Sequence, residues 1–335
     1  MTRISHFHIL FLALLLACSQ PASAFSSVYA FGDSLSDGGN SESSIFSIYN
    51  FLGQCHPARP CPPYYQGRYS NGPVAVERFA DAILPGGSNA DNFYNFAVAG
   101  STTGIGNAGD GGSQTKTGAF LLPGMARQIG EFLSSFSEHA DTDALYFVWG
   151  GANDYVTGAS AHTAAQNIAD YVDQLAEIGA QTIIVPNLPD LSLTPSIKAS
   201  GNQEVNLARS FSLDFNQTLA DLLNSVSIAQ PNTQIKQFDS YGFFNTIFQN
   251  PGVYGFNDAT TACVSLPTIC SNPEAHVFWD GFHPTARMHE LAAGAMVSQV
   301  PLPAAIWLFF SGLISLFFRK ACPAQIRISL QKFLD

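Results

Sequence analysis

The chain has 335 residues, which is enough for one large domain with a substantial buried core. Hydrophobic residues make up 46% and charged residues 12%, a composition that excludes a disordered chain and a charge-rich coiled coil. The formal net charge of −11, with only 14 Lys and Arg in the whole chain, excludes the dense basic patch that nucleic-acid binding requires.

The first 24 residues are predicted to form a signal peptide. Arg3 precedes an apolar run over residues 9–17, and small residues follow at 22–24, which is the layout of a secretory signal cleaved after Ala24. A second interpretation stays open, because residues 15–18 loosely resemble a lipoprotein cleavage box that would leave a lipidated Cys18 at the new N-terminus. Both interpretations predict export.

Residues 25–299 are predicted to form one domain, because no linker, charge run or repeat interrupts them. Short apolar runs predict buried strands at Ser27–Phe31, Asn92–Ala99, Ala144–Trp149, Thr182–Pro186 and Gln234–Phe238. Apolar residues at helical spacing predict helices over Met125–Phe136, Ala164–Ile178, Val205–Val226 and Pro284–Ser298, the last with proline in its first turn. This alternation predicts an α/β fold with a mostly parallel sheet covered on both faces.

A serine directly follows the first predicted strand. The sequence Phe31-Gly32-Asp33-Ser34 predicts a strand that ends in a tight turn and holds the Ser34 hydroxyl out of the sheet. Ligands bind outside the carboxyl ends of strands in such sheets, and free N–H groups there favour a developing anion. Taken alone, the segment is equally typical of an ordinary turn or a helix cap.

Three further segments strengthen a catalytic interpretation. Gly100 follows the second strand, where a glycine lets the backbone approach a reacting carbonyl and offer its N–H. Asn153 follows the third strand and supplies a neutral amide donor, although an Asx-turn would explain it as well. Asp280 stands three residues before His283, so the carboxylate can orient the imidazole as a general base.

Together these four segments resemble the conserved blocks of the GDSL (SGNH) hydrolase family, in the correct order over almost the whole mature domain. The stretch Gly67–Pro73, with Val76-Glu77, resembles the phospholipase-like branch that includes secreted hemolysin-type enzymes. The resemblance implies a flavodoxin-like three-layer sandwich with a mostly parallel five-stranded sheet. It implies Ser34 as nucleophile, His283 as base and Asp280 as the residue that orients the base. The oxyanion hole would consist of the Ser34 and Gly100 N–H groups with the Asn153 side chain.

The function implied by the resemblance is hydrolysis of carboxylic esters, as a lipase, esterase or phospholipase, through an acyl-enzyme. No cofactor and no metal is expected. The alternatives are a polysaccharide O-deacetylase or acyltransferase of the same fold, and a non-catalytic protein of an exopolysaccharide matrix. Tyr64-Tyr65 and Phe243-Phe244 are candidates to line an acyl or lipid pocket.

Residues 300–320 are predicted to be a sorting motif with a transmembrane helix, followed by a short tail at 321–335. An apolar stretch of about 17 residues, 302–318, is close to the thickness of a bilayer core, and Arg319-Lys320 follows it. The segment resembles the PEP-CTERM signals, of the Val-Pro-Leu-Pro-Ala type, that an exosortase processes. The resemblance implies an exosortase-type partner and at least transient anchoring in the inner membrane. Residues beyond Arg319-Lys320 depart from that pattern.

Four cysteines of the predicted domain form two close pairs, Cys55 with Cys61 and Cys263 with Cys270. In an exported protein such pairs predict two local disulfides that pin loops. A four-cysteine zinc site is the alternative, but neither pair has the Cys-x-x-Cys spacing.

Overall fold

The computed structural model describes residues 25–39, 61–135, 139–265 and 267–300. Phe25–Gln299 belongs to one compact unit. The predicted signal peptide, the predicted sorting motif and helix after residue 300, the tail and Cys55 lie outside the described residues. Within the described ranges, no helix has both the length and the apolar character needed to cross a bilayer.

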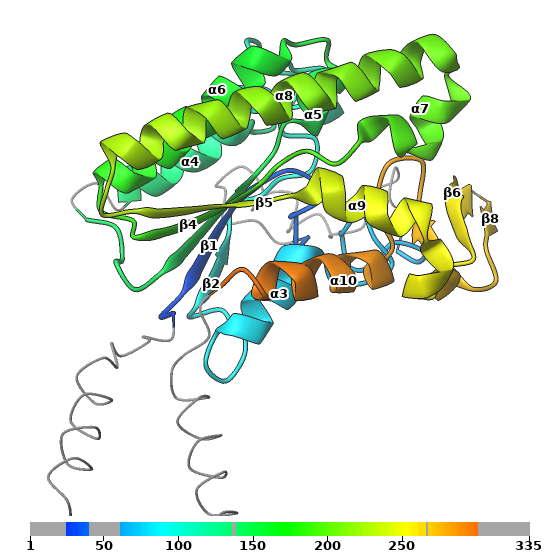
Figure 1. Cartoon of the computed structure of the whole chain (residues 1–335), viewed down its shortest axis with the longest axis horizontal. Coiled ribbons are helices and arrows are strands. Elements are labelled where there is room, and N and C mark those ends of the chain that lie inside the picture. Colours follow the sequence, from blue (N-terminus) through cyan, green and yellow to red (C-terminus); the bar gives the residue numbers. More distant parts are fainter. Residues whose placement is uncertain (1–24, 40–60, 136–138, 266, 301–335) are drawn as a thin grey trace, which may run out of the picture. The chain divides into compact units, whose positions relative to one another are not determined.

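A parallel five-stranded sheet forms the centre of this unit (Figure 1). Its strands are β1 (Val28–Gly32), β2 (Phe93–Asn95), β3 (Leu145–Trp149), β4 (Thr182–Pro186) and β5 (Gln234–Phe238). They lie in the spatial order β2-β1-β3-β4-β5, which is the flavodoxin-like order, and every neighbouring pair is parallel. The predicted fold class is confirmed. The strand order changes direction between β1 and β3, where such sheets bind their ligands.

Helices cover both faces of the sheet, so the unit is a three-layer sandwich. Helices α4, α6 and α8 lie on one face, and α3 and α10 lie on the other (Figure 1). The helices are α3 (Ala75–Ile83), α4 (Met125–Ser135), α5 (Ala152–Val156), α6 (Ala161–Glu177), α7 (Pro195–Ala199), α8 (Asn202–Ala229), α9 (Ser240–Gln249) and α10 (Ala286–Val297). Two small sheets pair β6 (Asp258–Ala262) with β9 (His276–Phe278), and β7 (Val264–Ser265) with β8 (Thr268–Ile269).

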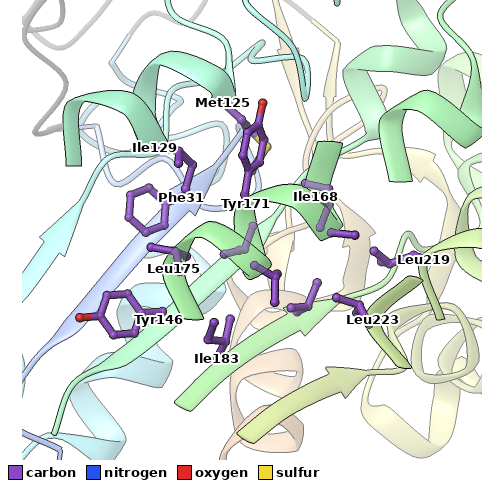
Figure 2. Close-up of a cluster of buried hydrophobic side chains, with 14 of the residues drawn as sticks. Phe31, Met125, Ile129, Tyr146, Ile168, Tyr171, Leu175, Ile183, Leu219 and Leu223 are labelled. Atoms are coloured by element: carbon purple, nitrogen blue, oxygen red, sulfur yellow. The ribbon is translucent and has the colours of Figure 1, made fainter. Parts of the chain in front are cut away.

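The main core lies between the sheet and α4, α6 and α8 (Figure 2). Successive strand residues point to opposite faces, so Tyr29 and Phe31 of β1 enter this core while Val28 and Ala30 face the other layer. On that other side, Phe79 of α3 packs against Phe147 of β3 with ring centroids 6.1 Å apart. Both faces of the sheet are therefore buried at its centre, which explains why β1, β3 and β4 are largely apolar runs, whereas the edge strand β5 carries polar, exposed residues.

The predicted elements differ from the observed ones mainly at their ends. β4 and β5 have the predicted bounds, but β2 stops at Asn95, whose side chain accepts from the Ala97 N–H and donates to the Ser36 carbonyl. The prediction that the last helix begins at Pro284 is wrong. The Thr285 hydroxyl caps α10, which begins at Ala286. Helices α3, α5, α7 and α9 and the two small sheets were not predicted from the sequence.

His289 of α10 is buried against α3. Its Nδ1 atom accepts a hydrogen bond from the Ala75 N–H at 3.1 Å. Burial, together with smaller effects of the charges of His283 and Arg78, lowers the pKa of His289 to about 3. The folded protein therefore keeps this imidazole neutral, whereas the unfolded chain takes up a proton near the ordinary pKa of about 6.5.

We expect the free energy of unfolding to fall as the pH drops below about 6.5, because the unfolded state then binds more protons than the folded state. His289→Gln keeps an acceptor for Ala75 but cannot be protonated, so it should remove on the order of 3 kcal/mol of the loss between pH 7 and pH 4. Urea unfolding across that range measures the effect, with the exposed His162→Gln as control. The same pH dependence in His289→Gln and wild type would contradict it.

Candidate active site

Ser34 lies in a tight turn directly after β1. The N–H groups of Ser36 and Asp37 donate to the Asp33 carbonyl at 3.0 and 2.9 Å, and the Leu35 N–H donates to the Asp33 carboxyl at 3.0 Å. The turn needs glycine at position 32, because a Cβ there would lie 2.4 Å from the Trp149 carbonyl oxygen of β3. The turn therefore presents Ser34 at the carboxyl end of the sheet, beside the segment that follows β3.

A buried glutamine of α4 fixes the end of β1. The Gln128 amide accepts from the Gly32 N–H at 2.9 Å and donates to the Gly32 carbonyl at 2.8 Å. It also donates to the Ser101 hydroxyl at 2.9 Å. Gln128 was not predicted as a site residue, although a glutamine between Met125 and Ile129 on the apolar face of a helix is a visible signal.

Gly100 and Asn153 follow β2 and β3 at the same edge of the sheet. The Asp37 carboxylate accepts from the Gly39 N–H at 2.7 Å and the Ala99 N–H at 2.9 Å, so it joins the turns after β1 and β2. Gly100 has a φ of +83°, which favours glycine. The Asn153 amide nitrogen donates to the Ser101 carbonyl at 3.0 Å and makes only a long contact of 3.4 Å with Asp33.

Asp154 links the segment after β3 to the loop after Gly100. Its carboxylate accepts from the Thr103 N–H and hydroxyl, both at 2.8 Å, and from the Gln114 amide at 2.9 Å. Asp37 and Asp154 thus support the turns that follow the strands. Together they fix the backbone on either side of Ser34, Gly100 and Asn153.

Asp280 and His283 come from the loop between β9 and α10. The Nε2 atom of His283 lies 2.8 Å from the Ser34 hydroxyl oxygen. Its Nδ1 atom lies 2.8 and 2.9 Å from the two carboxylate oxygens of Asp280. The Trp279 N–H donates to the His283 carbonyl at 2.7 Å and closes the loop. The structure thus brings the three predicted catalytic residues together, with 249 positions between Ser34 and His283 along the chain.

Two buried carboxyl groups at the site have opposite pKa shifts. Burial alone would raise the pKa of Asp280, but the charge of His283 and the hydrogen bonds from its ring and from nearby N–H groups hold it below its usual range. Burial raises the pKa of Asp33 to about 6, against the opposing effects of the Leu35 N–H and His283. At neutral pH Asp280 is therefore the firmly ionised partner of the histidine.

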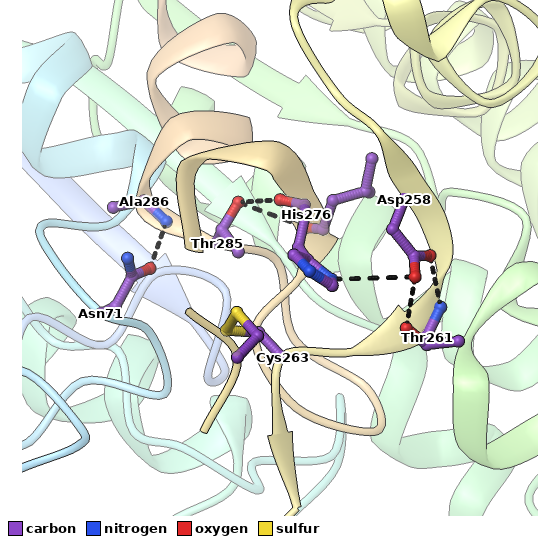
Figure 3. The surroundings of a disulfide bond; sticks show 9 residues. Asn71, Asp258, Thr261, Cys263, His276, Thr285 and Ala286 are labelled. Atoms are coloured by element: carbon purple, nitrogen blue, oxygen red, sulfur yellow. Dashed lines mark hydrogen bonds and ion pairs between the residues drawn. A yellow bond between two sulfur atoms is a disulfide. The ribbon is translucent and has the colours of Figure 1, made fainter. Parts of the chain in front are cut away.

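Two tyrosines that the sequence analysis did not assign to the catalytic group also contact it. The Tyr64 hydroxyl donates to Asp280 Oδ2 at 2.9 Å, and the Tyr69 ring lies 4.6 Å from the His283 ring between centroids. Cys263 and Cys270 form a disulfide (Figure 3). Both cysteines belong to the apolar cluster that surrounds Tyr64. Cys55 lies outside the described residues, so its pairing with Cys61 stays a prediction.

A cavity of about 180 Å³ opens beside Ser34, Asn153 and His283. Most of its wall is apolar and includes Leu191, Ile197, Phe244, Phe248, Phe278 and Phe282. Phe244 lines the cavity as expected, whereas Phe243 packs on Phe238 and Tyr64 contacts Asp280. Among the described residues, no cluster of His, Cys, Asp and Glu is suited to hold a metal ion.

The fold and this site define an α/β protein with a serine, a histidine and a carboxylate in one hydrogen-bonded row. A family model described as GDSL-like Lipase/Acylhydrolase matches residues 28–296. The chain belongs to that family, whose members hydrolyse ester bonds. The resemblance inferred from the sequence is confirmed at the level of the family.

Three relatives illustrate the range of the family. Phosphatidylcholine-sterol acyltransferase of Aeromonas hydrophila is 30% identical over 256 residues, which cover 75% of this chain and 69% of that protein. A GDSL esterase/lipase of Arabidopsis thaliana is 27% identical, with 85% of this chain and 92% of the relative covered. The thermolabile hemolysin of Vibrio parahaemolyticus is 26% identical, with 81% and 63% covered.

Proposed function

We propose that this protein hydrolyses carboxylic esters with apolar acyl chains through a covalent acyl-enzyme on Ser34. The observation that carries the proposal is the row Ser34–His283–Asp280, in which both ring nitrogens of the histidine have their partners at 2.8 to 2.9 Å. This geometry lets the histidine take the serine proton while the carboxylate stabilises the imidazolium that forms.

In the proposed mechanism, Ser34 Oγ attacks the ester carbonyl as its proton moves to His283 Nε2. The tetrahedral oxyanion accepts from the N–H groups of Ser34 and Gly100 and from the Asn153 amide. Neither backbone N–H donates a hydrogen bond elsewhere in the described part of the chain. The imidazolium then gives its proton to the leaving alcohol, and a water molecule activated by His283 releases the acid.

The apolar cavity supports a lipid-type substrate over a short acetyl ester. Its phenylalanine and aliphatic wall begins beside Ser34, so it can receive the acyl chain of the bound ester. A polysaccharide O-deacetylase has no use for such a wall beside its nucleophile. The acyltransferase alternative differs only in the acceptor, which is a second alcohol in place of water. Because the Aeromonas relative is named as an acyltransferase, this alternative is also to be measured.

We expect kcat/KM for p-nitrophenyl esters to rise about fourfold for each added methylene until the cavity is filled, because burial of a CH₂ contributes about 0.8 kcal/mol. The series from acetate to palmitate, measured on residues 25–299 and on its Ser34→Ala variant, tests this. An optimum at acetate would favour the deacetylase. Formation of an ester of an added alcohol, in place of the free acid, would favour the transferase. Equal turnover by the two proteins would contradict a serine esterase.

We also propose that the protein is exported, with cleavage after Ala24, and that an exosortase-type enzyme processes its C-terminal segment after transient membrane anchoring. The layouts of residues 1–24 and 300–320 and the Cys263–Cys270 disulfide support export. N-terminal sequencing of the protein from its host tests export and the cleavage after Ala24. A first residue Phe25 agrees with the proposal, whereas Met1 contradicts it and Cys18 indicates lipoprotein processing.

A further inference from the structure

Residues 61–72 lie against the loop that carries Asp280 and His283. The Asn71 side chain accepts from the Ala286 N–H at 2.7 Å, at the first residue of α10 (Figure 3). The Tyr69 ring packs against the His283 ring, and the Tyr64 hydroxyl donates to Asp280. One distant segment of the chain thus contacts the carboxylate, the imidazole and the helix that follows them.

The Asp280 carboxylate has a different set of donors on each oxygen. Oδ1 accepts from the N–H groups of Phe282 at 2.9 Å and His283 at 2.8 Å, both in its own loop. Oδ2 accepts from the Tyr64 hydroxyl at 2.9 Å, and the His283 ring lies within 2.9 Å of both oxygens. The hydroxyl of Tyr64 therefore restrains the Oδ2 side of the carboxylate, whereas the backbone N–H groups of the loop donate to Oδ1.

The Tyr64 ring is held before any substrate binds. Only 8% of this residue is exposed. Its ring packs edge-on against Tyr69 and Trp279, with centroids 5.9 and 6.1 Å apart, and against the disulfide-bonded Cys263. Since the ring is already ordered, the hydroxyl holds Asp280 without a further entropic cost during the reaction.

We propose that Tyr64 is a positioning residue of this site, which keeps Asp280 in the orientation that aligns and stabilises the His283 imidazolium. The inference rests on the proposed acyl-enzyme mechanism. Tyr64 acts through Asp280 and does not contact the substrate. Hydrogen bonds to charged groups are among the stronger ones in proteins. Loss of the bond from Tyr64 to Asp280 is therefore expected to lower the rate of ester hydrolysis.

Tyr64→Phe keeps the buried ring and removes the hydroxyl. We expect kcat for a p-nitrophenyl ester to fall about tenfold or more, with KM within about twofold of wild type. The rate constant of the p-nitrophenol burst should fall while its amplitude, which counts active sites, stays the same. Tyr65→Phe is the matched control, because the exposed Tyr65 ring lies against Arg68 outside the site. This substitution should leave kcat and KM unchanged.

A double-mutant cycle separates positioning from general stability. In an Asp280→Asn background, Tyr64→Phe should cause no further loss, since the group it orients has been removed. A kcat within twofold of wild type in Tyr64→Phe, or the same fold-loss in both backgrounds, would overturn the proposal. Failure of the proposed function itself is distinct from this result, because Ser34→Ala would then retain full turnover.

Discussion

Ser34→Ala should lower kcat for ester hydrolysis by about 10⁴-fold or more, because it removes the nucleophile and leaves only binding and the oxyanion hole. The fold should survive, since the Ser34 hydroxyl makes its hydrogen bond to His283 alone among the described residues. Thermal unfolding measured beside the ester assay separates loss of chemistry from loss of structure.

Ser36→Ala is the control for this experiment. Its hydroxyl is buried two residues further along the same turn and has no hydrogen-bond partner among the described residues. We expect Ser36→Ala to keep kcat within a few-fold of wild type. If Ser34→Ala retains a kcat similar to that of Ser36→Ala, then Ser34 is not the nucleophile.

Asn153→Ala should lower kcat by about 10²–10³-fold with little change in KM, which is the typical cost of losing one oxyanion donor. One of its amide hydrogens is held by the Ser101 carbonyl at 3.0 Å, and the other makes only the 3.4 Å contact with Asp33. The hydrogen without a short partner is therefore available to the oxyanion, which carries more negative charge in the transition state than the substrate carbonyl does in the ground state.

Asn167→Ala provides the comparison for Asn153→Ala. Asn167 also donates an amide hydrogen bond, to the Thr103 hydroxyl at 3.1 Å, but does so from α6 outside the cavity. Its loss should affect stability more than kcat. Steady-state kinetics on both variants measure the contrast, and a kcat for Asn153→Ala within a few-fold of wild type would remove Asn153 from the oxyanion hole.

The sequence was sufficient for those parts of the site that lie in short segments at strand ends. The central strands are largely apolar because both faces of the sheet are buried there, and the ends of the five strands could be located within four residues. Parallel strands have their carboxyl ends at one edge, which places the segments of Ser34, Gly100 and Asn153 close together. Asp280 and His283 were inferred from local spacing in the same way.

The residues that the sequence did not reveal act across long stretches of chain. Gln128 is 96 positions from Gly32, and Tyr64 is 216 positions from Asp280. No periodicity or motif couples such positions, since only the folded backbone brings them within hydrogen-bond distance. The cavity poses the same difficulty, because Phe248 lies on α9 and Phe278 on β9, elements that the apolar pattern did not predict.

Covalent labelling tests the central claim, that Ser34 carries the acyl group, most directly. The wild-type domain is treated with a fluorophosphonate, which reacts with activated serine hydroxyls, and digested for mass spectrometry. The mechanism predicts one adduct per chain, on the peptide with Ser34, formed as activity is lost and retained in Ser36→Ala. Full activity after prolonged treatment, or an adduct on another serine that tracks the loss of activity, would contradict it.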